Sequence, residues 1–176
     1  MKDDRFVLTA LSLLLALVLF IDDVSAQESV QFDWKVKQLS HGHEHMEWPV
    51  IVADQAGMVH IFWSSVETND HSGAIFYAYG DGSNMLVNDV IVGQVRTVRA
   101  ALDNNGTMHL IWHSSGKLKY STAPASSANS ARGWSKPVTV MDIPAYWPQL
   151  LVDPKGILHL AFSSIINTTS ALYYLR

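Results

Sequence analysis

PVIVADQAGMVHIFWSS, residues 49–65, decides the fold, because two gapless copies of its pattern follow later in the chain. These copies are VRAALDNNGTMHLIWHS at residues 98–114 and PQLLVDPKGILHLAFSS at residues 148–164. In all three, a Gly follows an Asp after three positions, and a His follows that Gly after three more. The copies recur at intervals of 49 and 50 residues. Such a period is typical of a repeated supersecondary unit.

Each copy predicts two antiparallel strands joined by a tight turn. The Asp-x-x-Gly segment lies between two apolar runs, where Asp can hydrogen-bond its own backbone and Gly can take a positive φ. After the Gly, the side chains alternate with the period of two that a strand requires. We therefore expect the three glycines to occupy hairpin turns: Gly57, Gly106 and Gly156.

Two further strands follow the repeated segment. A third is indicated by AIFYAY from Ala74, KLKYST from Lys117 and ALYYLR from Ala171, and a fourth by MLVNDVIV from Met85 and WSKPVTV from Trp134. After residue 26, no segment of useful length has the period of a helix. Four antiparallel strands in about fifty residues are typical of a β-propeller blade. The sequence therefore predicts an all-β protein of about three tandem blades.

The repeat divides the chain into units at about residues 49–97, 98–147 and 148–176, preceded by a strand of the fourth type, FDWKVKQL, at residues 32–39. That strand would close a ring by pairing with the last unit, which hides edge strands. Three units fall short of the roughly four to eight blades of a propeller. We expect an incomplete propeller, either a truncated piece of a longer protein or one half of a homodimer that completes a six-bladed ring.

Residues 1–26 predict a signal peptide. The stretch FVLTALSLLLALVLFI at residues 6–21 is apolar, and Val24-Ser25-Ala26 supplies the small residues that a signal peptidase favours. Its 16 residues fall short of the ~20 that span a bilayer. We expect export, with residues 27–176 secreted or periplasmic and no membrane span after signal removal; an uncleaved anchor is the alternative.

The composition excludes two classes of function. The chain has 12 Lys and Arg against 16 Asp and Glu, and it has no long basic run. This charge balance excludes a basic surface for binding nucleic acid. The chain contains no Cys, which excludes a disulfide framework and thiolate chemistry.

A His-rich segment is the candidate metal site. His41, His43 and His45 alternate with Gly42 and Glu44, and neutral imidazoles in an extended loop can offer several nitrogens to Zn²⁺ or a similar divalent ion. The alternative is a solvated polar loop between blades. No other cofactor is expected.

Three further histidines recur in every unit: His60, His109 and His159. A catalytic residue is needed only once in a protein, whereas a residue that stabilises the packing of a blade is needed in every blade. We therefore expect these side chains to be structural, each bonding the backbone of a neighbouring blade.

The segments that enter each unit differ from one another, and variable loops on a repeated scaffold carry function. They are Glu47-Trp48-Pro49, Arg96-Thr97-Val98-Arg99 and Tyr146-Trp147-Pro148. Aromatic rings can stack on sugar faces while charged groups bind hydroxyls or a carboxylate. The candidate ligand-binding residues are Glu47, Trp48, Arg96, Arg99, Tyr146 and Trp147. The alternative is that the two Trp side chains only cover the blade ends.

The unit has four notable features: Pro-x-x-x-x-Asp-x-x-Gly, a His-containing strand ending in Trp-Ser, a Tyr in the third strand, and Trp-Ser-x-Pro at the fourth. In these it resembles the repeat of the sialidase (neuraminidase) superfamily of six-bladed propellers. The Asp-box of that family, Ser-x-Asp-x-Gly-x-Thr-Trp, is matched in part by residues 80–85, and in the next unit only by Ser121, Gly133 and Trp134.

The resemblance implies a glycan-related role but not its chemistry. Family sialidases hold the substrate carboxylate with three Arg side chains and use a Tyr nucleophile assisted by Glu, with an Asp as acid/base. After residue 26 the chain has four Arg, at positions 96, 99, 132 and 176, and the catalytic set has no assignable match. Two functions follow: an extracellular module that binds a glycan or protein through its blade-entry rim, or a sialidase-type hydrolase completed by absent blades or a partner subunit.

Overall fold

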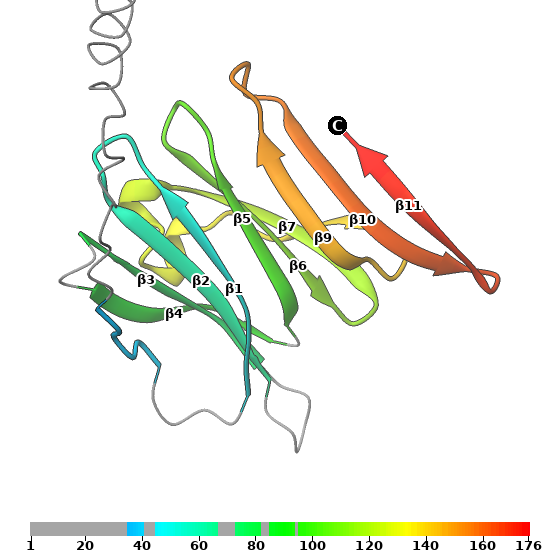
Figure 1. Cartoon of the computed structure of the whole chain (residues 1–176), viewed down its shortest axis with the longest axis horizontal. Helices are drawn as coiled ribbons and strands as arrows, with labels where there is room; N and C mark the ends of the chain where they lie inside the picture. The colour runs from blue at the N-terminus through cyan, green and yellow to red at the C-terminus, as the bar shows by residue number, and fades with distance from the viewer. Residues whose placement is uncertain (1–34, 41–44, 67–72, 82–84, 94) are drawn as a thin grey trace, which may run out of the picture. The chain divides into compact units, whose positions relative to one another are not determined.

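The computed structural model describes residues 35–40, 45–66, 73–81, 85–93 and 95–176 (Figure 1). The chain divides into two units, Met1–Lys37 and Gln38–Arg176, and the second contains all the described strands. The expected signal peptide at residues 1–26 lies outside the described residues. In the described part of the chain, no helix is long and apolar enough to cross a bilayer.

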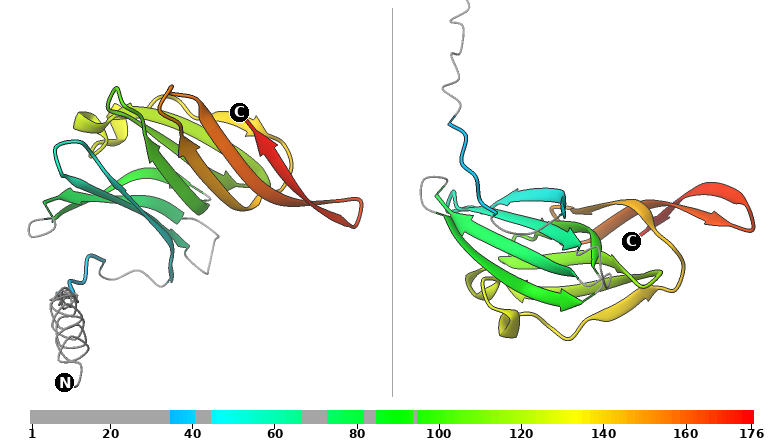
Figure 2. Two further views of the ribbon diagram at one scale, coloured as in Figure 1. Left: turned by 45° about the horizontal axis from the view of Figure 1, so that its top comes forward. Right: turned by 90° about the horizontal axis from the view of Figure 1, so that it is seen from below.

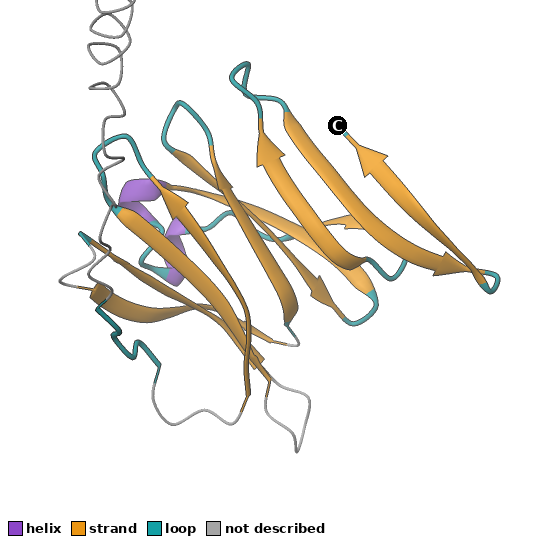
Figure 3. Ribbon diagram, viewed as in Figure 1, coloured by secondary structure: helices purple, strands orange, loops and turns teal. Residues whose placement is uncertain are grey.

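The second unit is all-β and consists of three antiparallel sheets (Figure 3). Sheet 1 contains β1 (His45–Ala53), β2 (Val59–Val66), β3 (Gly73–Gly80) and β4 (Met85–Gly93). Sheet 2 contains β5 (Arg96–Leu102), β6 (Thr107–Ser114), β7 (Lys117–Pro124) and β8 (Val138–Met141). Sheet 3 contains β9 (Tyr146–Val152), β10 (Leu158–Ile166) and β11 (Thr169–Leu175). Two 3₁₀ turns, η1 (Ala125–Ser127) and η2 (Ala131–Gly133), join β7 to β8. Within each sheet, each strand pairs with the next one along the chain, so the predicted all-β repeat of antiparallel strands is confirmed.

The three repeated glycines lie in hairpin turns, as predicted. Their φ angles are +79° at Gly57, +76° at Gly106 and +79° at Gly156, in the left-handed region that glycine tolerates. In the first turn, the Gly57 N–H donates to the Asp54 carbonyl at 3.1 Å and the Asp54 N–H donates to Met58 at 2.9 Å. The other two turns repeat these bonds. The Asp-x-x-Gly segment thus closes each hairpin by local chemistry alone.

Apolar side chains hold the sheets together face to face. On β6, successive side chains point to opposite faces of sheet 2. Met108, Leu110 and Trp112 belong to the buried cluster shared with sheet 1, which includes Phe62. Ile111, between them, belongs to the cluster shared with sheet 3. Sheet 2 is therefore buried on both faces.

The first strands of the sheets lie side by side, β1 against β5 and β5 against β9 (Figure 2). These three strands run in the same direction (Figure 1). Their first residues therefore gather along one edge of the unit, and this edge carries the segments that enter the three repeat units.

The strand expected at residues 32–39 is absent from the described part of that segment. Residues 35–40 belong to no strand, and Val36 is fully exposed. A strand is held by its ladder to a neighbour, and residues 35–40 form no ladder in the described structure. Residues 32–34 lie outside the described residues.

Candidate functional site

A β-bulge interrupts the first strand of every sheet at the same place in the repeat. The pairing register shifts between Glu47 and Val50 in β1 and between Arg96 and Arg99 in β5. In β9 it shifts between Tyr146 and Gln149, which pair with Ser163 and Ala161 of β10. One residue in each bulge is left-handed: Trp48 with φ +56°, Thr97 with φ +53° and Trp147 with φ +48°. Bulges change the direction of side chains, and a left-handed residue other than glycine costs roughly 1–3 kcal/mol. Trp48, Thr97 and Trp147 keep this left-handed conformation within the three sheets.

The first bulge forms a cluster with the neighbouring sheet. The Trp48 indole Nε1–H donates to the Glu47 carboxylate at 2.9 Å. The Arg99 guanidinium carbon lies 5.8 Å from the centre of the Trp48 ring, within cation–π range. Burial lowers the pKa of Arg99, yet an Arg side chain remains charged in proteins. Trp48 is 38% exposed, so this aromatic and ionic cluster is open to solvent.

The third bulge presents an aromatic pair. Tyr146 and Trp147 open β9 and are 43% and 65% exposed. Their ring centroids are 6.1 Å apart and the ring planes are inclined by 48°. The pair therefore offers aromatic surface to solvent on the edge that also carries the first cluster.

Arg96 is exposed and belongs to neither of these two clusters. It opens β5 and pairs in register with His113 of β6. Burial, with the Arg96 charge as the second cause, lowers the pKa of His113, so His113 stays neutral near pH 7. The structure thus joins Glu47, Trp48 and Arg99 in one cluster and Tyr146 with Trp147 in another.

The His-rich segment is described only at its end. His45 is exposed and opens β1 opposite Val66, whereas His41 and His43 lie outside the described residues. Among the described residues, no group of three His, Asp or Glu side chains is arranged to hold a metal ion. The metal site stays a sequence-based prediction.

Each sheet contains a hydrogen-bonded chain of Asp, His and Tyr side chains that the sequence did not reveal. His60 Nδ1 lies 2.6 Å from the Tyr77 hydroxyl, and its Nε2 lies 3.4 Å from Asp54 Oδ2. In sheet 2 the corresponding distances are 2.7 and 3.5 Å, and in sheet 3 they are 2.6 and 3.2 Å. The chains are Asp54–His60–Tyr77, Asp103–His109–Tyr120 and Asp153–His159–Tyr174. Since an ionised carboxylate only accepts, a neutral His donates from Nε2 and accepts the Tyr hydroxyl at Nδ1.

These partners correct the expectation for the repeated histidines. Each His bonds side chains of its own sheet rather than the backbone of a neighbouring blade. The chain joins the hairpin turn to the second and third strands of the same sheet. Its recurrence in all three sheets supports a structural role.

Backbone donors keep the three aspartates ionised. The pKa of Asp54 is lowered chiefly by the N–H of Met58, and that of Asp153 by the N–H of Ile157. Burial raises the pKa of Asp103, but hydrogen bonds from two backbone N–H groups and from His109 outweigh it, so the pKa is also lowered. At the other end, burial raises the pKa of Tyr77 and of Tyr120. These two hydroxyls therefore stay protonated and able to donate.

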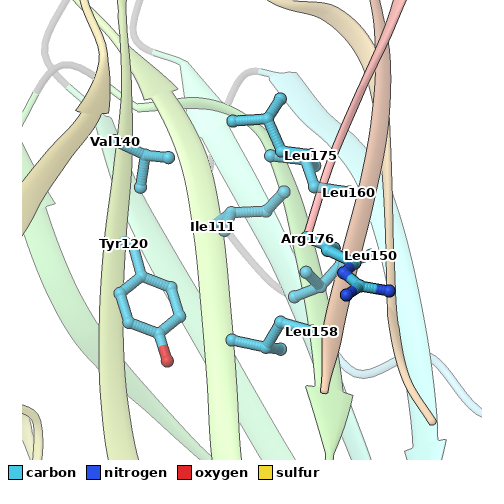
Figure 4. A pocket seen from close by; sticks show the side chains of 8 residues that line it. All are labelled: Ile111, Tyr120, Val140, Leu150, Leu158, Leu160, Leu175 and Arg176. Atoms are coloured by element: carbon cyan, nitrogen blue, oxygen red, sulfur yellow. The ribbon is translucent and has the colours of Figure 1, made fainter.

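An apolar cavity of about 250 Å³ lies between sheets 2 and 3 (Figure 4). It is lined by Ile111, Tyr120, Val140, Leu150, Leu158, Leu160, Leu175 and Arg176. A ligand site needs several placed polar groups, and this lining offers only the Tyr120 hydroxyl and the Arg176 guanidinium. None of the candidate ligand-binding residues lines it. We interpret it as a gap in the packing of the two sheets.

Neither the scan against protein-family models nor the search of curated proteins finds a match for this chain. The likeness to the sialidase repeat therefore rests on the motifs in the sequence.

Proposed function

We propose that the three sheets are blades of a β-propeller, and that the protein is an exported module which binds a glycan through its blade-entry edge. The repeated antiparallel sheets, packed face to face with their first strands side by side, support the propeller. The predicted signal at residues 1–26 supports export.

The observation that carries the glycan proposal is the pair of solvent-open aromatic clusters on one edge. Trp48 lies beside the Glu47 carboxylate and the Arg99 guanidinium, and Tyr146 lies against the 65%-exposed Trp147. Exposed rings suit the apolar face of a sugar, while the two charged groups suit its hydroxyls or a carboxylate. Both Trp residues are held in a costly left-handed conformation, and such strain concentrates at binding sites.

A glycan array with matched variants tests this function. We expect Trp147→Ala to weaken binding by roughly tenfold, a loss of about 1.4 kcal/mol, because the most exposed ring of the edge is removed. Arg99→Lys keeps the charge but loses the planar fork and the ring contact, so it should also weaken binding. Val138→Ala is the control, since Val138 is 54% exposed on β8, in the fourth strand of sheet 2.

Unchanged binding by Trp147→Ala and Arg99→Lys would contradict the assignment of the edge. An array on which the unaltered protein binds no glycan would contradict the ligand class. Turnover of a fluorogenic sialoside by the same preparation would contradict binding without reaction and support the hydrolase alternative.

A further inference from the structure

The turn between β5 and β6 carries a sequence pattern that the proposed function does not use. Residues Asn105-Gly106-Thr107 form a sequon, the Asn-x-Thr pattern of an acceptor for N-linked glycosylation, within the repeated Asp-x-x-Gly turn. Such a short pattern also occurs by chance, so the structure around it has to support the assignment. Sheet 2 packs with sheet 1 on one face and with sheet 3 on the other, so the neighbours of this turn on both sides belong to the described chain.

The turn leaves both functional side chains of the sequon unused. Asn105 is exposed, and Thr107 is half-buried at the first position of β6. The Asn105 N–H donates to Asp103 Oδ1 at 2.9 Å, and the Thr107 N–H donates to the same oxygen at 2.7 Å. Within the described residues, the hydrogen bonds of Asn105 and Thr107 are made by their backbone groups. The Asn105 amide and the Thr107 hydroxyl are therefore available for another purpose.

The two other turns show that the fold does not require Asn at this position. The equivalent of Asn105 is Ala56 in sheet 1 and Lys155 in sheet 3, and all three residues are exposed. The N–H of each donates to the Asp side chain of its own turn, at 2.9 Å for Ala56 and Asn105 and 2.8 Å for Lys155. Since a methyl, an amide and an ammonium side chain serve equally, the identity of this side chain is open to a role other than folding.

The third position of the sequon differs from the repeat in chemical type. Met58 and Ile157 are the apolar equivalents of Thr107, and their N–H groups make the same bond to Asp at 2.8 and 2.9 Å. The hydroxyl of Thr107 is thus an addition that the other two turns do without. Among the three repeated turns, an Asn followed two residues later by a Thr occurs only between β5 and β6.

We propose that Asn105 is a site of N-linked glycosylation. This rests on the proposed export, because the modification occurs on secreted proteins. The donor is an oligosaccharide carried on a lipid diphosphate, and a transferase of the host secretory pathway is the catalyst. The Asn105 amide nitrogen forms a bond to the anomeric carbon of the first sugar and loses one proton to a base of the transferase. The bond from that carbon to the lipid diphosphate breaks, and the lipid diphosphate leaves with the electron pair.

The attached oligosaccharide lies at the end of the unit away from the candidate ligand-binding residues. The β-bulge with Thr97 is near the first residue of β5, whereas the turn with Asn105 follows its last residue, Leu102. A strand of 7 residues spans roughly 20 Å. The oligosaccharide therefore leaves the edge with the bulges open, and glycosylation does not compete with ligand binding there.

Translation of the full chain in the presence of endoplasmic-reticulum microsomes tests the site. A second sequon, Asn167-Thr168-Thr169, is removed by Thr169→Ala so that the result reports on Asn105 alone. In this background we expect a gel shift of one oligosaccharide, reversed by an N-glycosidase. Asn105→Gln and Thr107→Val should each abolish the shift, whereas Thr107→Ser should retain it because the hydroxyl is kept. Asn104→Gln is the matched control, since Asn104 is exposed beside the site but lies outside the sequon, and it should retain the shift.

Protection of the chain from added protease reports its entry into the microsomes independently of glycosylation. A protected chain without the gel shift would overturn the glycosylation of Asn105 and leave the proposed export intact. A chain that stays outside the microsomes would overturn the export and this proposal together. A shift that persists in Asn105→Gln would also overturn the proposal, because the sugar would then be attached elsewhere.

Discussion

At the scale of single residues, the Asp–His–Tyr chain is the main polar feature of the described structure. It recurs with the same geometry in a buried and in an open setting, since the His Nδ1 to Tyr hydroxyl distance is 2.6 Å in sheets 1 and 3. The same hydrogen bond can therefore be removed from both settings, and its dependence on burial can be measured.

We expect Tyr77→Phe to lower the free energy of unfolding by about 1–3 kcal/mol, because it leaves the buried His60 Nδ1 without a donor. Tyr174→Phe should cost clearly less, since water can replace the hydroxyl at an exposed site. Urea unfolding of the unaltered protein and of the two variants measures both losses. Equal losses would contradict the role of burial.

The three aspartates make the fold sensitive to acid. Their pKa values are lower in the folded chain than the ordinary value of 3.8. A lowered carboxyl pKa contributes stability that is present above the ordinary value and is lost as the pH falls below it. We expect a constant melting temperature from pH 7 to about 5 and a fall below about pH 4. Asp103→Asn should flatten that fall, and a melting temperature unchanged down to pH 3 would contradict the mechanism.

At the scale of strands and turns, the hairpins were predictable because their chemistry is local. Asp and Gly three residues apart define the turn, and alternation defines the strands that flank it. The Tyr partners were not predictable, since they lie 17, 11 and 15 residues after their His and have no fixed spacing. The left-handed Trp48 and Trp147 were also missed, because a residue before Pro ordinarily prefers an extended backbone.

The turn glycines lead to a prediction at this scale. A Cβ at Gly106 would meet no atom within 4 Å, so only the φ of +76° requires glycine there. We expect Gly106→Ala to cost about 1–2 kcal/mol without altering the fold. At Gly133, by contrast, a Cβ would lie against the Ser127 backbone, so Gly133→Ala should cost more by displacing the 3₁₀ turn. Denaturant unfolding compares the two, and an undiminished stability in Gly106→Ala would contradict the assigned conformation.

At the scale of the whole second unit, the proposed glycan site lies along one edge. The glycan would bind at the bulges of the first strands. The repeat itself was predictable from sequence. The unequal burial of equivalent positions was not predictable, because Leu151 and Leu172 look like any other strand residue until their burial is compared with that of Ala101 and Leu118.

Because each sheet contains both hydrogen-bond partners of its own repeated His, that His needs no polar contact from a neighbouring sheet. Such units are interchangeable building blocks. A gene encoding them can lengthen by duplication, or lose a copy, without the remaining units having to acquire new polar contacts. Each copied unit would therefore bring its own Asp–His–Tyr chain with it, since these three side chains bond only within one sheet.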